Sequence, residues 1–400
     1  MSDEGGPGTI TVASRLSGYL RGGGVLVPIV TALLAFIVGG LVVLATGANP
    51  FSTYKAIFEG TGLNWFFPWL SSDDRIVAEL NLQQTLIATT PLILCGLAVA
   101  FAFRCGLFNI GGQGQYLVGT YFAVWVGSSF QDMAALPHIL LSIIAACLAG
   151  AVWGGLAGLL KAATGAHEVI STIMLNWIAL WVGVWLVNLN GPLQNTEQKS
   201  VPVSPDIAEG AKLPVFWGDP ELQGLHVGLF VALAALLVFW VLLNRTVTGY
   251  EVRAVGFNPE AARAAGINVS RNYILVMAIC GLFAGLAASL DVLGWQFRVA
   301  RNDIEISQIG FLGIAVALLG RNTAVGTLFS ALLFGALLTG TSVRNLDPLV
   351  FPPELATALT SIIQGLIVLF VSADILVVYL WRLRRRIRRR GPAESEAVAA

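Results

Sequence analysis

The sequence predicts an all-α fold, a polytopic transmembrane helical bundle of about ten spans. Two compositional facts carry this prediction: apolar residues make up 56% of the 400 residues, and charged residues only 12%. A soluble domain usually carries about 25% charged residues. The third observation is that the apolar residues come in uninterrupted runs, about as long as the ~20 residues that cross a bilayer.

The expected spans follow from these runs, with boundaries reliable to a few residues. The third and eighth are short and interrupted by glycine, which is typical of broken or tilted helices that line a pathway. Merging or expelling them would leave an alternative of eight spans. The ten are Val25–Ala45, Leu82–Phe103, Tyr116–Phe130, Ile139–Leu160, Val169–Leu189, Leu225–Leu243, Tyr273–Leu293, Ile306–Leu319, Thr323–Thr341 and Leu359–Leu380.

Basic residues predict the orientation, because cytoplasmic loops are enriched in Lys and Arg. With the N-terminus inside, the 23 basic residues divide sixteen inside to seven outside. We therefore expect a multi-pass protein of the cell membrane with both termini in the cytoplasm: a leader at 1–24, a transmembrane domain at 25–380 and an Arg-rich tail at 381–400. The tail has the composition of a contact with anionic membrane lipid, and equally that of a stop-transfer signal.

Two loops are long enough to carry structure of their own. Residues 190–224 are rich in proline and polar residues, which favours a solvated, irregular extracytoplasmic cap. Residues 244–272 form the main cytoplasmic loop and contain a short helix of about two turns, which Asn258 would cap and Gly266 would end. A helix this short needs packing to be stable, either on its own domain or in a partner's groove. The segment comprises Asn258, Pro259, Glu260, Ala261, Ala262, Arg263, Ala264, Ala265 and Gly266.

The sequence carries no signature of an enzyme. It has no nucleotide-binding, zinc-protease or hydrolase motif and no CxxC pair, so we expect no catalytic residues, no metal and no cofactor bound by this chain. A net charge of zero gives no reason to expect nucleic acid as a partner. Asp291 and Asp374 are placed near span ends, within reach of water, so the spans hold no acid–base relay for proton coupling.

The densest polar cluster between two spans is Arg104–Gln115, with four glycines and three amides. Glycines allow backbones to approach closely, and the amides of Asn109, Gln113 and Gln115 can both donate and accept hydrogen bonds to an uncharged solute. The alternative is a tight interhelical turn in which the amides hold helices together. Residue chemistry alone leaves these two open.

A second cluster begins at the cytoplasmic turn before the fifth span. His167 and Glu168 are placed to cap that helix, where an acid meets the positive end of the helix dipole. Thr172 and Asn176 lie four residues apart and share a face. They either line the pathway or bond to a neighbouring helix, and the second use is the commoner.

Five ordered motifs between about residues 82 and 380 resemble the permease subunits of ABC importers of the branched-chain amino acid/simple sugar permease family, with the nucleoside and simple-sugar branch nearest. The sequence departs from the family's pattern at Gln113, where the family often has an acid, and at Cys105, where a small residue is usual. The motifs are Thr90–Phe101, Gly106–Gln115, Glu168–Asn176, Gly256–Ile267 and Gly310–Gly320.

The resemblance implies an ATP-driven importer in which this subunit forms the pathway for a nucleoside or related simple sugar by alternating access. The short helix at 258–266 would be the coupling helix that docks on a separate ABC ATPase, which binds ATP and Mg²⁺. A second permease subunit, a paralogue or another copy, would complete the pathway. An extracytoplasmic solute-binding protein would deliver solute to the outer face at 190–224 and 342–356.

Two other functions are compatible with the residues. A self-sufficient secondary transporter or channel for a small polar solute would be active from this chain alone and indifferent to changes at 256–266. A membrane scaffold without a transport role would tolerate alanine at Asn109, Gln113 and Gln115. The isolated loop helix and the missing charge relay favour the importer.

Overall fold

The computed structural model describes residues 26–220, 224–342 and 353–372. The chain divides into two compact units, residues 48–360 and residues 1–47 with 361–400. The second unit contributes α2 (Leu26–Ala45) and the end of α15 (Pro353–Ser372). The predicted leader, the Arg-rich tail, Asp374 and most of the loop at 342–356 lie outside the described residues.

Each of the ten predicted spans contains a helix. Within the described residues, seven helical segments are long and apolar enough to cross a membrane. They involve α2, α4 (Ser72–Arg104), α6 (Ala135–Thr164), α7 (Glu168–Val187), α8 (Gly228–Arg245), α11 (Val269–Asp291) and the pair α12–α13 (Arg301–Ile306, Ile309–Leu319). The remaining three spans correspond to α5 (Gly112–Ser129), α14 (Ala324–Gly340) and α15. The all-α prediction is confirmed. The eighth span is interrupted at residues 307–308, between α12 and α13, whereas the third span, also expected to be broken or tilted, lies in the uninterrupted helix α5.

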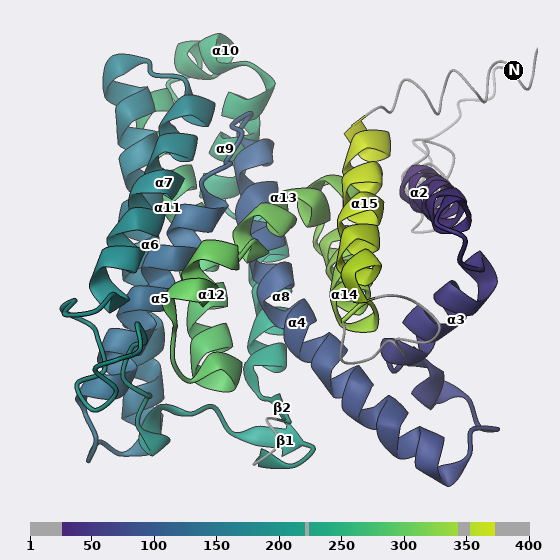
Figure 1. Ribbon diagram of the computed structural model, residues 1–400. Coiled ribbons are helices and arrows are strands. Elements are labelled where there is room, and N and C mark those ends of the chain that lie inside the picture. Colours follow the sequence, from purple (N-terminus) through teal and green to yellow (C-terminus); the bar gives the residue numbers. More distant parts are fainter. Residues whose placement is uncertain (1–25, 221–223, 343–352, 373–400) are drawn as a thin grey trace, which may run out of the picture. The chain divides into compact units, whose positions relative to one another are not determined.

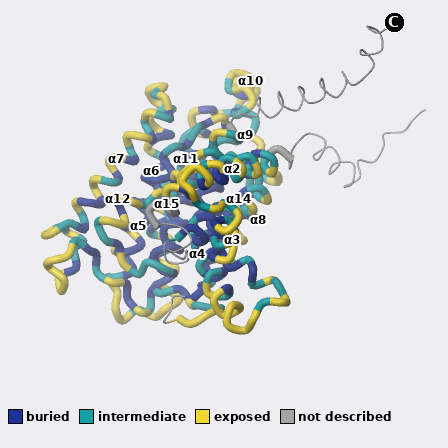
Figure 2. Tube along the Cα trace, turned by 45° about the vertical axis from the view of Figure 1, so that its right-hand side comes forward, coloured by how far each residue is buried: buried dark blue, intermediate teal, exposed yellow. Residues whose placement is uncertain are grey.

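Helix α4 forms the core of the unit at 48–360. Of its most apolar 18-residue window, 83% is buried, against 28% in α6 and α7. It packs against α11, α13, α14 and α8. Helix α7, by contrast, has exposed residues along its outward side, drawn in yellow in Figure 2. An apolar helix surrounded by other helices can carry polar groups that do not face lipid, so α4 is where an interior site is expected.

Glycines allow α6 and α11 to touch backbone to backbone. A Cβ on Gly281 would lie 1.9 Å from the carbonyl oxygen of Gly150, and one on Gly154 would lie 2.3 Å from that of Met277. Small residues at such crossings are the usual means of helix association in membranes. The pair α6–α11 is therefore a closely fitted seam.

The two ends of this unit differ in structure. Figure 1 shows α9 (Val247–Phe257) and α10 (Pro259–Ala264) at one end of the bundle and the hairpin of β1 (Val215–Trp217) and β2 (Leu225–His226) at the other. We call these the α10 end and the hairpin end. The strands are antiparallel, with Val215 opposite His226. Strand β2 occupies the first two residues of the span that was predicted to begin at Leu225.

The segment between α7 and α8 is more ordered than the expected solvated, irregular cap. Ile207, Ala208 and Leu213 are buried. The backbone N–H of Ala208 donates to the Gly127 carbonyl at 2.8 Å, and that of Leu213 to the Leu293 carbonyl at 2.8 Å. Its described parts are thus bonded to the hairpin end of α5 and to the turn that follows α11, and they include the 3₁₀ turn η2 (Glu209–Ala211). This packing could not be predicted from the sequence, because the buried apolar residues of the segment are isolated among polar ones and follow no helical or strand periodicity.

Two more elements precede α4: α3 (Pro50–Gly60) and the 3₁₀ turn η1 (Leu63–Phe66). Asn49 caps α3, since its side chain accepts a hydrogen bond from the N–H of Phe51, and Pro50 takes the first helical position. The hydroxyl of Thr85 in α4 donates to the Thr61 carbonyl at 2.8 Å. This contact fixes the end of α3 against α4.

His226 makes the hairpin end sensitive to pH. Its side chain is buried, its Nδ1 accepts the N–H of Gly228 at 3.2 Å, and burial lowers the pKa of the imidazole from 6.5 to about 4. Between pH 6.5 and 4 only the unfolded chain takes up this proton, so stability falls as pH falls through that window and is unaffected above it. We expect a loss of about 2 kcal/mol at pH 5, measured by thermal unfolding at pH 5 and 7.5. The pH-dependent difference should shrink in H226Q; an equal difference in both proteins would contradict the assignment.

Candidate functional site: an amide cluster and a polar cavity

The predicted polar residues gather at the first turn of α5. Asn109 and Gln115 are buried and bond to each other reciprocally: the Asn109 amide donates to Gln115 Oε1 at 3.0 Å, and the Gln115 amide to Asn109 Oδ1 at 3.2 Å. Two amides that satisfy each other can be buried at little cost. The pair braces the loop that joins α4 to α5.

Gln113 points the other way, to the start of α13. Its amide donates to the Ser307 carbonyl at 2.9 Å, and its Oε1 accepts the N–H of Gly310 at 2.9 Å. A Cβ on Gly310 would lie 2.4 Å from the Gln113 Cα. Gln113 therefore bonds to the chain on both sides of the break between α12 and α13.

The fifth-span residues meet the same cluster from α7. Asn176 Oδ1 accepts the N–H of Gly114 at 2.8 Å, and its amide donates to the Ile110 carbonyl at 3.0 Å. The Thr172 hydroxyl donates to the Glu168 carbonyl one turn earlier at 2.8 Å, while its Cβ lies beside Gly111. The structure thus brings all five predicted residues together. That they touch a solute stays a prediction, since a solute would have to replace these partners.

The end of α7 opposite the hairpin is capped as predicted. His167 is the N-cap residue, and its Nδ1 accepts the N–H of Val169 at 3.4 Å. Glu168 is buried and receives the Lys161 ammonium at 2.6 Å. This ion pair ties the end of α6 to the start of α7, where an acid also favours the helix dipole.

Asn176→Leu tests what the cluster does. The substitution leaves the N–H of Gly114 and the carbonyl of Ile110 without their partner, which should cost about 2 kcal/mol or more. We expect a lower melting temperature of the purified protein in detergent. Asn244→Leu is the matched control, because Asn244 is exposed and bonds only within its own helix to the Trp240 carbonyl. An unchanged melting temperature combined with altered solute preference would instead make Asn176 a contact of the solute.

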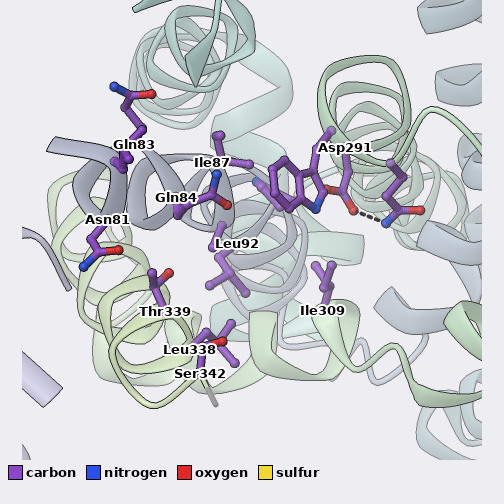
Figure 3. Close-up of a pocket in the computed structure, with 15 residues that line it drawn as sticks. Asn81, Gln83, Gln84, Ile87, Leu92, Asp291, Ile309, Leu338, Thr339 and Ser342 are labelled. Atoms are coloured by element: carbon purple, nitrogen blue, oxygen red, sulfur yellow. Dashed lines mark hydrogen bonds between the residues drawn. The ribbon is translucent and has the colours of Figure 1, made fainter. Parts of the chain in front are cut away.

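A cavity of about 400 Å³ lies beside this cluster, between α4, the end of α11, α13 and α14. Helix α4 contributes Asn81, Gln83 and Gln84. Figure 3 shows Asp291 at one end of the cavity, Asn81 and Thr339 at the other, and Gln84 between them. The volume falls in the range of small-molecule pockets. Polar side chains from helices far apart in sequence therefore converge on an interior space.

Asp291 corrects a prediction made from sequence. It was expected near a span end and accessible to water, but it is only 5% exposed and lines the cavity. The Gln296 amide donates to its Oδ2 at 2.6 Å, and the Tyr116 hydroxyl donates to the same oxygen. The cause is the length of the helical segment: it continues past Asp291 to Gln296. An ionisable residue at such a place is a marker of function.

That continuation is a π-helical turn, η4 (Val292–Gln296), which ends at Phe297 with φ of 57°. The wider turn carries Trp295 and Gln296, which line the cavity together with Asp291. Such turns occur frequently at functional sites, and a left-handed Phe is uncommon enough to mark a constrained position. Sequence patterns gave no signal of this turn.

The α10 end presents the predicted loop helix. Asn258 Oδ1 accepts the N–H groups of Glu260 and Ala261 at 3.0 and 3.1 Å, and Gly266 ends the turn with φ of 84°. The Arg263 guanidinium lies 2.9 Å from the Glu260 carboxylate. The helix does not stand alone, however: α9 precedes it directly and ends at Phe257, which is 91% exposed.

Helix α9 is fitted to the core at the same end. A Cβ on Gly256 would lie 2.3 Å from the Arg104 carbonyl oxygen, and the Arg104 guanidinium donates to the Asn322 carbonyl through Nη2 at 2.6 Å. Arg104 ends α4, and Asn322 lies in the turn between α13 and α14. A movement of α9–α10 would thus reach α4 directly and, through the turn at Asn322, α13 and α14, all three of which line the cavity.

Comparison with known proteins identifies the class of molecule. Residues 81–372 match the family described as branched-chain amino acid transport system / permease component. The chain belongs to this family. The match covers the cavity, the amide cluster and α9–α10, and the resemblance read from the five motifs is confirmed.

Individual relatives of this permease carry more specific names. It is 40% identical to the guanosine ABC transporter permease protein NupP of Bacillus subtilis, over 87% of this chain and 93% of that protein. It is 34% identical to the nucleoside ABC transporter permease protein NupB of Lactococcus lactis, over 85% and 89%. It is also 34% identical to the glucose ABC transporter permease protein TsgB13 of Haloferax volcanii, over 86% of each chain.

Proposed function

We propose that this permease forms the translocation pathway for a nucleoside in an ATP-driven importer. The observation that carries the proposal is the 40% identity to a guanosine permease over nearly its whole length. The cavity supports it, because amide groups and an aromatic ring suit a solute that has both hydroxyls and a flat base. The glucose permease among the relatives makes a simple sugar the second candidate.

The energy would come from a partner. The sequence holds no nucleotide-binding motif, so ATP and Mg²⁺ would bind to a separate ABC ATPase that docks on α10. Docking would place the exposed Phe257 and the first turn of α10 in a groove of the ATPase. The contacts of Gly256 and Arg104 would then pass its movement to α4 and to the α13–α14 turn.

The remaining parts of the importer follow from the same proposal. A second permease subunit, a paralogue or another copy of this chain, would face this one across the pathway. An extracytoplasmic binding protein would deliver the nucleoside at the hairpin end. The protein would lie in the cell membrane with its α10 end and both termini in the cytoplasm, as the sixteen-to-seven division of basic residues favours.

Uptake by the reconstituted complex tests the proposal. Proteoliposomes with ATP enclosed should accumulate radiolabelled nucleosides when both permeases, the ATPase and the binding protein are present. Glucose serves as the competing solute. Accumulation of glucose but not of any nucleoside would overturn the nucleoside assignment, and uptake by this chain without the ATPase would favour the secondary transporter.

A further inference from the structure

The Asp291 end of the cavity holds acceptor capacity that the protein does not use. A carboxylate offers about four lone-pair positions. Both side-chain hydrogen bonds to Asp291, from Tyr116 and Gln296, go to Oδ2. Figure 3 draws one of these bonds as a dashed line from Asp291. Among the described residues none donates a side-chain hydrogen bond to Oδ1, so a ligand in the cavity would meet an acceptor with an open oxygen.

The rest of the cavity restricts what that ligand is. Among the described residues that line the cavity, Asp291 is the one with an ionisable side chain. An anionic solute would meet a buried carboxylate without a compensating cation, which is strongly unfavourable. A neutral solute with N–H donors, by contrast, would satisfy the carboxylate with charge-assisted hydrogen bonds. The site therefore selects against phosphorylated solutes and favours N–H donors.

The neighbours of Asp291 fit the two halves of a nucleoside. Trp295 comes from the same π-helical turn and lines the same cavity, where its indole provides a flat surface of the kind on which bases stack. Asn81 and Gln84 lie away from Asp291, toward the opposite end (Figure 3). Their amides can donate to and accept from ribose hydroxyls.

We propose that Asp291 is a specificity-determining residue of this permease, which recognises a purine nucleoside through an N1–H donor on the base. Guanosine and inosine carry this donor, whereas purine riboside has no N–H on its base. In this arrangement the base stacks on Trp295, and its N1–H donates to the open Oδ1 of the carboxylate. The inference rests on the proposed nucleoside function and adds a selection made by the permease itself, separate from that of the binding protein.

Asp291→Asn tests the proposal in the complete importer. Uptake of inosine, guanosine and purine riboside is measured in proteoliposomes, and each variant rate is divided by the wild-type rate for the same solute. The binding protein is identical in both preparations, so its own selectivity cancels in this ratio. A hydrogen bond to a charged acceptor is worth about 1.5–3 kcal/mol, so inosine and guanosine uptake should fall about 10- to 100-fold. Purine riboside uptake should stay within about twofold.

Two further variants keep the result interpretable. Asp132→Asn removes an exposed carboxylate outside the cavity and should leave all three ratios near one. Gln296→Ala removes a donor from Oδ2 and so leaves the carboxylate a stronger acceptor for the N1–H at Oδ1. Inosine uptake should rise relative to purine riboside several-fold, about the effect of one neutral hydrogen bond. This variant tests the idea even where D291N fails to assemble.

The outcomes separate the two proposals. A wild-type importer that accumulates no nucleoside contradicts the proposed function. A wild type that accumulates nucleosides, while D291N lowers all three solutes by the same factor or none of them, overturns the role of Asp291 and leaves the function intact. An unchanged inosine-to-purine-riboside ratio in Q296A counts against it as well.

Discussion

Ala261→Trp should abolish ATP-driven uptake while leaving the permease folded. Ala261 is exposed on the first turn of α10, where its N–H is held by Asn258 and its side chain is free to face a partner. An indole at this position would keep the helix out of a groove that accepts a small side chain, because close-packed interfaces do not tolerate added volume. We expect at least a tenfold loss of uptake, with stimulation of the ATPase by the binding protein lost in parallel.

The matched control is Ala163→Trp. Ala163 is also exposed and stands in the last turn of α6, a different element from α9 and α10. It should transport at nearly the wild-type rate. Full ATP-driven uptake by A261W would contradict the assignment of α10 as the coupling element, whereas a melting temperature below that of wild type would show damage to the fold instead.

Gly281→Leu should have the largest effect on stability. Its Cβ would overlap the carbonyl oxygen of Gly150 at 1.9 Å, and backbone, unlike the end of a side chain, cannot move aside locally. Separating α6 from α11 should cost about 3 kcal/mol or more. The expected result is a marked drop in melting temperature and in the yield of monodisperse protein in detergent.

Gly155→Leu is the corresponding control on the same pair of helices. A Cβ there meets only the Ala278 side chain at 3.7 Å, an ordinary contact, so the protein should behave like wild type. If both variants lower the melting temperature and the yield to a similar extent, any bulky residue on these helices is harmful, and the close backbone contact at Gly281 has no particular importance for stability.

The helices and their ends were predictable because their signals are local. Apolar runs define the spans, and the Asn258 cap with Gly266 after it defines α10 within nine residues of sequence. Helix α9 was missed although Thr246 caps it, accepting the N–H of Gly249. Its close approach to the end of α4, at Gly256, is a tertiary contact. No property of residues 247–257 by themselves reports that contact.

The candidate site was likewise predictable only in part from the sequence. Amides and glycines identified the cluster around α5, and the structure brings those residues together, but their hydrogen-bond partners come from α13 and α7 and could not be read from spacing. Asp291 was misplaced for a similar reason. Hydropathy ends its span at about residue 293, whereas burial depends on the π-helical turn and on the neighbouring helices that enclose it.

The break on either side of α13 has a mechanical consequence. Because the glycine seam packs α6 closely against α11, we expect any bending of the bundle to occur where the chain leaves helical geometry. Residues 307–308 interrupt the helix before α13, and after it Arg321 and Asn322 adopt left-handed backbone angles, with φ of 51° and 54°. Helix α13 is thus a short helix with a non-helical connection at each end. Gln113 bonds to the first connection and Arg104 to the second.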